Sequence, residues 1–362
     1  MKTIDESEPK QPVDEKASMN HASSGRPIGT LKSRWLARAI GGPLHRDRML
    51  AIIVVALVVL ISLRFPRFAS PSSLGELLDD TSILIVLALG QMLVLLTRAI
   101  DLSVAANLAL SGMIAAMFNQ SYPDAGVATA IALAFVSGTM LGAFNGLLVW
   151  RLRLPPIVVT LGTLSIYRGL IYVISHGAWV NSSEMSPAFL QLVRLRFLGM
   201  TVLCWLAIAC AVAFWAMLRH SIFGRQLFAS GGNPEAAAYA GIDAGRMQFF
   251  AFTVNGALAG ICGYLWVSRY AVAYTDVALG FELQVIAACL IGGVSIAGGI
   301  GTAAGVVAGC LFLGVIRNAL PLVGISPFWQ MAVNGLVICV AAVVNARSEG
   351  SRRRQSILEA SA

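Results

Sequence analysis

The chain has 362 residues, of which 57% are hydrophobic and 12% are charged, and its formal net charge is +8. Soluble domains carry about 25% charged residues. This chain therefore has too few charges to cover the two soluble domains that its length would allow. The composition predicts an integral membrane protein.

The lysines exclude two kinds of chemistry. None is part of the Gly-Lys-Ser/Thr sequence of a phosphate-binding loop, so the chain does not bind ATP through such a loop. A Schiff-base lysine within the membrane is excluded because no lysine follows Lys32. The cysteines lie singly in apolar runs without a histidine cluster, which predicts small buried side chains and no metal site. We also expect no catalytic residue and no bound cofactor in this chain.

Three regions follow from the distribution of polar residues. Residues 1–48 are polar, end in a basic run and lack the apolar core of a secretory signal. We expect this segment to be a disordered cytoplasmic tail whose basic end lies against anionic lipid headgroups. Residues 49–345 form the predicted transmembrane domain, and residues 346–362 form a second cytoplasmic tail.

Ten apolar stretches are candidates for membrane spans, because a bilayer core of ~30 Å requires about 20 apolar residues per helix. Their approximate ranges are 49–64, 80–97, 101–118, 125–150, 156–175, 199–218, 247–268, 283–298, 302–317 and 328–345. The fold class is thus all-α and polytopic. Placing the N-terminus in the cytoplasm puts most arginines of the connections on that side, as the positive-inside rule requires. Both termini are then cytoplasmic.

A glycine pattern occurs twice and predicts an inverted 5+5 repeat. Gly138-Thr139-x-x-Gly142-x-x-x-Gly146 recurs as Gly301-Thr302-x-x-Gly305-x-x-x-Gly309. The two copies lie in the fourth and ninth spans, and this odd offset turns the second copy upside down, as in many transporters. Close helix packing through small residues explains the same pattern without a repeat.

Polar residues within apolar segments are candidates for a gate or for the lining of a pathway, because such residues are costly in lipid. Between the second and third spans, Arg98 and Asp101 are spaced to pair on one helical turn, and Asp101 or Ser103 can cap the following helix. The segment is therefore either a capped cytoplasmic turn or part of a gate. The other pathway or gate candidates are Asn145, Thr160, Arg168 and Ser295.

Each of those candidates also has a structural interpretation. Arg168 lies within the fifth span and either snorkels towards the interface or faces the pathway. Buried amides such as Asn145 more often form hydrogen bonds between helices. Ser295 belongs to the glycine-rich stretch 292–301, which either interrupts a helix or makes a tight turn.

The loop between the sixth and seventh spans contains a predicted short helix. Asn233 is a suitable N-cap, Pro234 suits the first helical position, and Glu235 complements the helix dipole. Gly241 then ends the helix. This helix is either a rigid element that fits a groove in a partner or a surface connector.

That helix contains Glu-Ala-Ala-x-x-x-Gly, the motif by which permeases of ATP-binding-cassette (ABC) importers dock their ATPases. The chain resembles the ribose/xylose/arabinose permease family through further segments. These are Ile100-Asp101-Leu102-Ser103-Val104, Val159-Thr160-Leu161-Gly162-Thr163, Arg168-Gly169-Leu170, Gly292-Gly293-x-Ser295-x-x-Gly298-Gly299-x-Gly301 and Gln330-Met331.

The resemblance implies a permease subunit in a bacterial inner membrane that translocates a monosaccharide of the pentose or deoxyhexose class. It implies as partners an ABC ATPase that carries ATP and magnesium, a periplasmic sugar-binding protein, a second permease copy or paralogue, and the lipid bilayer, but no nucleic acid. Carried over by position, Arg225, Glu235, Ala236, Ala237 and Gly241 form the ATPase-coupling segment. The chain itself is then not an enzyme.

The sequence departs from the family at two places. The longer docking motif continues to an Ile-x-Leu-Pro that is absent here, and Arg98-Ala99 replaces the Gly-Gly that is common before Ile-Asp-Leu-Ser. The second departure suggests a subgroup, for which a rhamnose-type importer is our hypothesis. The alternative function is an ion-coupled secondary transporter of a small polar solute, since such proteins also have inverted repeats and broken helices.

Overall fold

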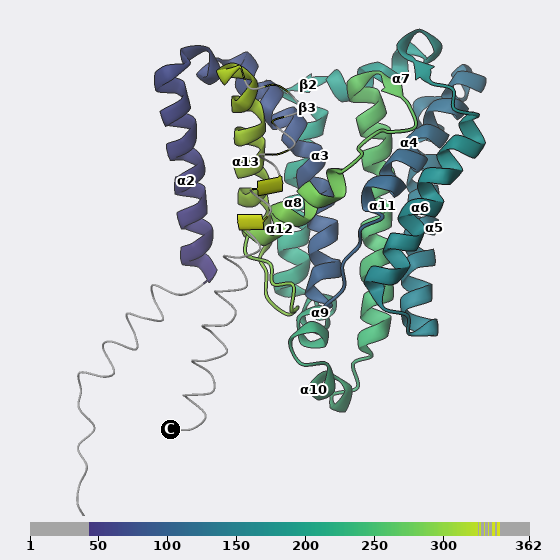
Figure 1. Cartoon of the computed structure of the whole chain (residues 1–362), viewed down its shortest axis with the longest axis vertical. Coiled ribbons are helices and arrows are strands. Elements are labelled where there is room, and N and C mark those ends of the chain that lie inside the picture. The colour runs from purple at the N-terminus through teal and green to yellow at the C-terminus, as the bar shows by residue number, and fades with distance from the viewer. Residues whose placement is uncertain are drawn as a thin grey trace, which may run out of the picture. The chain divides into compact units, whose positions relative to one another are not determined.

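Figure 1 shows the computed structural model of the chain, which describes residues 43–324 and, beyond them, Ser326, Trp329, Ala332, Gly335, Leu336, Cys339 and Val340. The chain divides into two units, 1–42 and 43–362, and all of these residues belong to the second. Residues 1–42 of the first predicted tail and the second tail, 346–362, lie outside the described residues, whereas residues 43–48, also expected to be disordered, are helical. Most of the predicted span 328–345 also lies outside the described residues.

The described part of the chain is built of helices. In chain order the α-helices are α2 (Pro43–Arg64), α3 (Pro71–Leu96), α4 (Val104–Ser121), α5 (Val127–Leu152), α6 (Pro156–Ser175), α7 (Pro187–Gln191), α8 (Val202–His220), α9 (Ile222–Gly232), α10 (Pro234–Tyr239), α11 (Ala244–Tyr270), α12 (Phe281–Ile291) and α13 (Ala303–Ala319). Six of the described helices, α3, α5, α6, α8, α11 and α13 with its 3₁₀ extension, are long and apolar enough to cross a membrane. The expected all-α, polytopic architecture is confirmed.

Short elements join these helices. The 3₁₀ turns are η1 (Pro66–Ala69), η2 (Pro123–Ala125), η3 (Ser182–Glu184), η4 (Leu192–Arg194) and η5 (Leu320–Val323). Strand β1 (Val180–Asn181) pairs antiparallel with β4 (Val272–Ala273), with Val180 opposite Ala273. Strands β2 (Arg196–Phe197) and β3 (Met200–Thr201) form a second antiparallel pair, with Arg196 opposite Thr201.

Side-chain caps explain where several helices begin. The hydroxyl of Ser70 accepts a hydrogen bond from the Ser73 amide at the start of α3, where Pro71 occupies the first helical position. Thr302 caps α13 in the same way. These caps bond amides that lack a partner within the helix. Because Ser70 and Pro71 set its start, α3 begins before the predicted residue 80.

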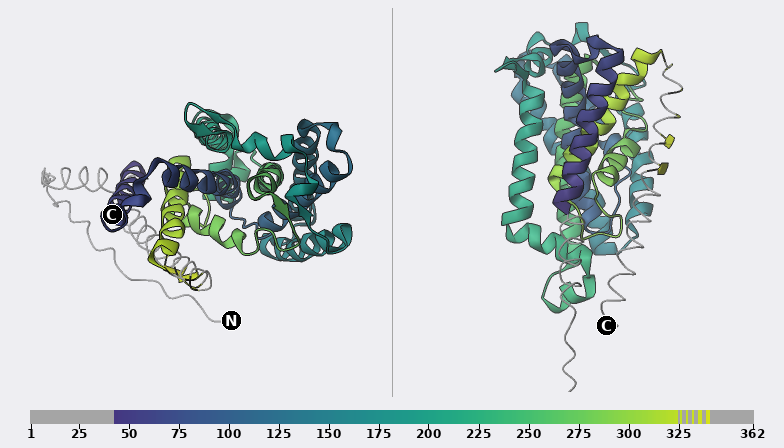
Figure 2. Two further views of the ribbon diagram at one scale, coloured as in Figure 1. Left: turned by 90° about the horizontal axis from the view of Figure 1, so that it is seen from above. Right: turned by 90° about the vertical axis from the view of Figure 1, so that its left-hand side faces the viewer.

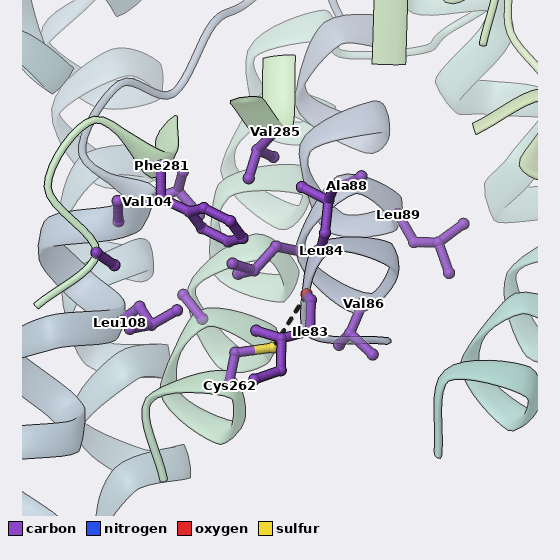
Figure 3. Packing of buried hydrophobic residues seen from close by; sticks show 14 of the residues in the cluster. Ile83, Leu84, Val86, Ala88, Leu89, Val104, Leu108, Cys262, Phe281 and Val285 are labelled. Carbon is purple, nitrogen blue, oxygen red and sulfur yellow. Dashed lines mark hydrogen bonds between the residues drawn. The ribbon is translucent and has the colours of Figure 1, made fainter. Parts of the chain in front are cut away.

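Helix α3 lies at the centre of the core. It is the most buried of the six candidate spans, and Figure 3 shows Ile83, Leu84 and Ala88 of α3 among side chains from α4, α11 and α12. The thiol of Cys262 on α11 donates to the carbonyl oxygen of Ile83 at 3.9 Å, and Cys289 on α12 donates to that of Ala88 at 3.2 Å. Cys204, Cys262, Cys289 and Cys310 are buried as predicted, Cys210 is half-buried and Cys339 is exposed.

The arginines of the described residues separate between the two ends of the helices. At the end that carries α9 and α10, which we call the α10 end, lie Arg98, Arg151, Arg153, Arg219, Arg225 and Arg246. The opposite end, near α7, carries Arg64, Arg67, Arg194, Arg196, Arg269 and Arg317. The predicted distribution over the two sides is thus reproduced, and the placement of the α10 end in the cytoplasm stays a prediction.

Helix α4, with 18 residues, and helix α12, with 11, each follow an extended segment, and α12 is too short to cross a bilayer. The chain leaves α3 at the α10 end, runs back through residues 97–103 and begins α4 in the interior (Figure 1). In the opposite direction, it leaves α11, runs back through residues 271–280 and begins α12. The predicted span 283–298 is corrected here, because α12 ends at Ile291 where the glycine-rich stretch begins. These two breaks are related as the expected inverted repeat requires.

The repeated glycine pattern serves close packing at both copies, but against different partners. On α5, Gly138 and Gly142 face Gly256 and Gly260 of α11, and a Cβ at Gly256 would lie 2.5 Å from the carbonyl oxygen of Gly138. On α13, Gly305 faces the turn after α12. Figures 1 and 2 show α11 beside α5. Small side chains let these backbones touch.

We predict that Gly142→Val separates α5 from α11. A Cβ at this position would lie 2.7 Å from Cα of Gly256, and overpacking of this kind costs about 1–3 kcal/mol or more. The purified variant should therefore unfold at a lower temperature than the wild-type protein in the same detergent. Gly162→Val on α6 is the matched control, because a Cβ there meets no atom within 4 Å. Equal melting of the two variants would contradict the close contact.

Candidate functional site

The first break contains a buried carboxylate. Asp101 is 2% exposed. Its Oδ1 accepts hydrogen bonds from the Ser103 amide at 2.9 Å and from the Ser103 hydroxyl at 2.7 Å. Its Oδ2 accepts one from Nδ2 of Asn255 on α11 at 2.9 Å. Asp101 thus bonds the start of α4 to the centre of α11.

The predicted pairing of Arg98 with Asp101 is wrong. Arg98 has a positive φ of 63°, which turns its side chain away from the interior, and its guanidinium donates to carbonyl groups at the end of α9. The predicted side-chain cap on α4 is also wrong in detail. Ser103 is at the N-cap but gives no side-chain cap, since its hydroxyl bonds Asp101 instead.

The polar network extends from Ser103 to two further helices. Asn145 on α5 donates from Nδ2 to the Ser103 hydroxyl at 2.8 Å, and the Tyr167 hydroxyl on α6 lies 3.3 Å from Oδ1 of Asn145. Thr160 on α6 donates to the carbonyl oxygen of Ile100 at 3.2 Å. The structure therefore brings together Asp101, Ser103, Asn145 and Thr160, which the sequence analysis named singly.

Asn255 and Tyr167 complete this network; Asn255 is among the amides that the sequence offers as candidates for lining a pathway, whereas Tyr167 was not expected. Asn255 is one of several amides in the apolar spans, and nothing in its neighbours distinguishes it. Tyr167 immediately precedes Arg168, so it lies one position from a candidate residue but on another face of α6. Only its distance from Asn145 reveals its role.

Arg168 supports the second break. Its Nη1 donates to the carbonyl oxygens of Thr275 at 3.3 Å and Val277 at 2.7 Å, both in the extended segment before α12. The side chain is half-buried and bonded to this segment, and the snorkelling interpretation stays a prediction. Its role in lining a pathway stays a prediction.

The glycine-rich stretch forms a tight turn at the α10 end. Ser295 accepts the Ala297 amide at its hydroxyl oxygen at 3.1 Å, and its own amide donates to Ile300 at 2.9 Å. Gly298 and Gly299 both have positive φ, of 82° and 69°, which other residues adopt at a cost. The Gly299 amide donates to the carbonyl oxygen of Leu96 at 3.0 Å, so this turn contacts the end of α3.

The short helix α10 has the predicted ends. Oδ1 of Asn233 accepts the Ala236 amide at 3.1 Å, and Pro234 occupies the first position. Gly241 has φ of 77°, and the Ile242 amide returns to the carbonyl oxygen of Ala237 at 2.9 Å, which closes the helix. Glu235 and Ala236 are exposed, whereas Ala237 is buried.

Two residues complete the description of this segment. Arg225 on α9 is exposed and donates to the carbonyl oxygen of His220 at 3.4 Å. Tyr239, which the sequence analysis did not select, is 95% exposed at the last position of α10. The exposed ring of Tyr239 leaves apolar surface in contact with water, which is typical of a binding surface. Helix α10 therefore presents a contact surface of one acidic side chain, Glu235, and one aromatic side chain, Tyr239.

An ionic cluster at the opposite end was not predicted. Arg269 at the end of α11 lies 3.6 Å from Asp79 and 3.2 Å from Asp80, both near the start of α3. Asp79 also accepts a short hydrogen bond from the Thr201 hydroxyl at the start of α8. No local sequence pattern indicates this cluster, because Arg269 lies 189 residues after Asp80 along the chain.

Together, a bundle with two broken helices, a buried polar network and a capped helix at one end define a polytopic membrane permease. Residues 73–342 match the family described as branched-chain amino acid transport system / permease component. The chain belongs to this family of permease components. No solved structure is a significant match to the chain.

Three curated relatives are similar over most of their length. The L-arabinose ABC transporter permease protein AraH of Azospirillum brasilense is 33% identical over 323 residues, covering 89% of this chain and 94% of AraH. The ribose import permease protein RbsC of Escherichia coli K12 is 35% identical over 300 residues, covering 82% and 93%. The autoinducer 2 import system permease protein LsrC of Salmonella typhi is 33% identical over 307 residues, covering 84% and 86%. The chain is therefore a multi-pass inner-membrane transport subunit.

We predict that Asn255→Ala destabilises the protein through Asp101. The change removes the donor to Oδ2 of the buried carboxylate, and a buried polar group that loses its partner costs about 1–3 kcal/mol. The thermal midpoint in detergent should fall. Asn318→Ala on α13 is the control, since Asn318 bonds only the Gly314 carbonyl of its own helix among the described residues. If Asn255→Ala and Asn318→Ala had the same thermal midpoint, the hydrogen bond of Asn255 to Asp101 would contribute little to stability.

Proposed function

We propose that this chain is the membrane-spanning subunit of an ABC importer and translocates a monosaccharide of the pentose or deoxyhexose class. A periplasmic binding protein delivers the sugar, and a separate ATPase subunit carries ATP and magnesium. The names of AraH and RbsC assign arabinose and ribose to those relatives, which supports a sugar of this size. A rhamnose-type substrate stays a hypothesis within that class.

The observation that carries the proposal is the geometry of α10. The helix is capped at both ends, so it can move as a rigid element when a docked ATPase moves. Ala237 anchors it to the protein, whereas Glu235 and Tyr239 face outward. Arg225, Glu235, Ala236, Ala237 and Gly241 form the coupling segment on which the ATPase docks. From this docking role we infer that the α10 end and both termini lie in the cytoplasm.

No covalent chemistry is required of this chain. Nucleotide binding closes the two ATPase subunits, and the docked α10 moves with them. The breaks before α4 and α12 are the places where the bundle can change shape, because continuous helices are stiff. A second copy of this chain or a paralogue completes the pathway. The sugar needs only weak contacts, such as those of amides and hydroxyl groups, because the binding protein has already selected it.

An ion-coupled secondary transporter is the alternative function. It would require an ionisable group within the membrane, and Asp101 is the buried carboxylate that could serve. The family membership favours the ABC importer instead, since its relatives are permease components of import systems. Uptake that persists when ATP is depleted but collapses with an ionophore would support the alternative.

We predict that Glu235→Arg abolishes co-purification with the ATPase. The change reverses the charge on the exposed face of α10 without touching its caps. The complex should be purified in mild detergent from cells that contain the whole transport system, and the ATPase quantified. Asp124→Arg is the matched control, because Asp124 is an exposed acid at the opposite end. ATPase that stays bound to the residue 235 variant would contradict docking through α10.

We further predict that α10 is reached only from the cytoplasm. In a Cys339→Ser background, Ala236→Cys should react with a membrane-impermeant maleimide only after spheroplasts are permeabilised. Asp124→Cys should react in intact spheroplasts, because both positions are exposed and lie at opposite ends. The reverse pattern would invert the topology and remove the coupling role of α10.

A further inference from the structure

Arg98 occupies a backbone position that favours glycine. Its φ is 63°, and an L-residue with a side chain is strained in this left-handed region, whereas glycine is not. The strain is maintained because the side chain makes interactions that offset it. Those interactions connect the first break to the segment that carries α10.

The guanidinium of Arg98 is bonded to the last carbonyl groups of α9. Its Nε donates to the carbonyl oxygen of Gly231 at 2.6 Å, and its Nη2 donates to that of Gly232 at 2.9 Å. Carbonyl groups at a helix C-terminus lack partners within the helix and carry partial negative charge. A guanidinium offers two donors in a fixed fork, so it holds both carbonyls in one orientation.

Three backbone segments meet beside this contact, and they pack so closely that no side chain fits between them. A Cβ at Gly231 would overlap the carbonyl oxygen of Leu96, and a Cβ at Gly299 would lie 2.5 Å from Cα of Gly232. The Gly299 amide also donates to Leu96 at 3.0 Å. We call the segments 96–98, 231–232 and 298–299 the glycine junction. These close contacts keep the segments from approaching further, and the hydrogen bonds of Arg98 keep 231–232 from separating from residue 98.

The glycine junction lies directly between the proposed docking helix and the buried network. Gly232 is followed by Asn233, the cap of α10, and Arg98 is three residues before Asp101. The Gln248 side chain on α11 bonds the intervening carbonyl of Thr97 at 3.0 Å. Among the described residues, the hydrogen bonds that tie the end of α9 to residues 97–103 are those of the Arg98 side chain.

We propose that Arg98 is a positioning residue that transmits movement of α10 to the break between α3 and α4. This inference rests on the proposed function of α10. Without the arginine, α10 still binds the ATPase, but its movement no longer reaches residues 97–103. The substitution Arg98→Gly relieves the backbone strain, so the variant keeps its fold. It loses only the hydrogen bonds between residue 98 and the carbonyl groups of Gly231 and Gly232.

The experiment measures nucleotide-dependent exposure of Ile100, which is half-buried in the break. Ile100→Cys is placed in the Cys339→Ser background, and the whole complex is reconstituted in lipid nanodiscs. The rate of maleimide labelling is compared with and without a non-hydrolysable ATP analogue and magnesium. Bound ATPase and the thermal midpoint are measured on the same samples.

We expect the nucleotide to change the labelling rate about fivefold or more in the wild-type background, which is the scale of coupling between distant sites. Arg98→Gly should reduce this ratio to about one while the ATPase stays bound. Arg98→Lys, which keeps the charge but lacks the fork, should give an intermediate ratio. Arg153→Gly should leave the ratio unchanged, because it removes another left-handed arginine at the same end.

Three results, each with the ATPase bound, overturn this inference and leave the proposed function intact. The first is a nucleotide response that persists in Arg98→Gly, and the second is a wild-type complex in which residue 100 does not respond to nucleotide. The third is a reduced ratio in Arg153→Gly, because the effect would then not be specific to Arg98. A wild-type chain that holds no ATPase overturns the proposed function and this inference with it.

Discussion

Backbone carbonyl and amide groups inside a membrane have no water to bond, and this constraint governs the whole structure. A continuous helix satisfies them by itself, but this chain interrupts helices at two places. The freed groups are bonded by other elements of the protein. At the first break, Gly299, Gln248 and Thr160 bond the carbonyl oxygens of Leu96, Thr97 and Ile100. The breaks can exist only because these donors surround them.

The two breaks are related in direction but are held by different chemistry. At the first, Asp101 and Ser103 supply acceptors, and amides from α5 and α11 supply donors. At the second, one cationic side chain, Arg168, bonds two carbonyl groups. At the second break one nitrogen, Nη1 of Arg168, donates both hydrogen bonds, whereas the first break is bonded by side chains from several helices. The first break, which also receives the connection from α9, is therefore the better candidate for the moving part.

The sequence predicted the features that depend on neighbours along the chain. The caps of α10 at Asn233 and Gly241 are confirmed, because a helix end is encoded within a few residues. Six of the predicted spans coincide with helices that are long and apolar enough to cross a membrane, and the described helices follow the predicted order. The predicted pair of Arg98 and Asp101 failed because spacing alone assumes a helical turn, whereas φ at Arg98 is positive. Asn255, Tyr167 and the cluster of Arg269 with Asp79 could not be placed, because their partners are more than twenty residues away.

Helix α12 has 11 residues and so extends ~16 Å at 1.5 Å per residue, about half of the ~30 Å hydrocarbon thickness. A segment of this length cannot be integrated as an independent span during synthesis. Its flanking segments, 271–280 and 292–301, have backbone groups whose partners lie on other elements, such as β1 and the end of α3. Residues 271–301 must therefore enter the bilayer together with α11 and α13, after α3 is in place to receive them. The order of membrane insertion is thus set by the shortest apolar helix of the described bundle.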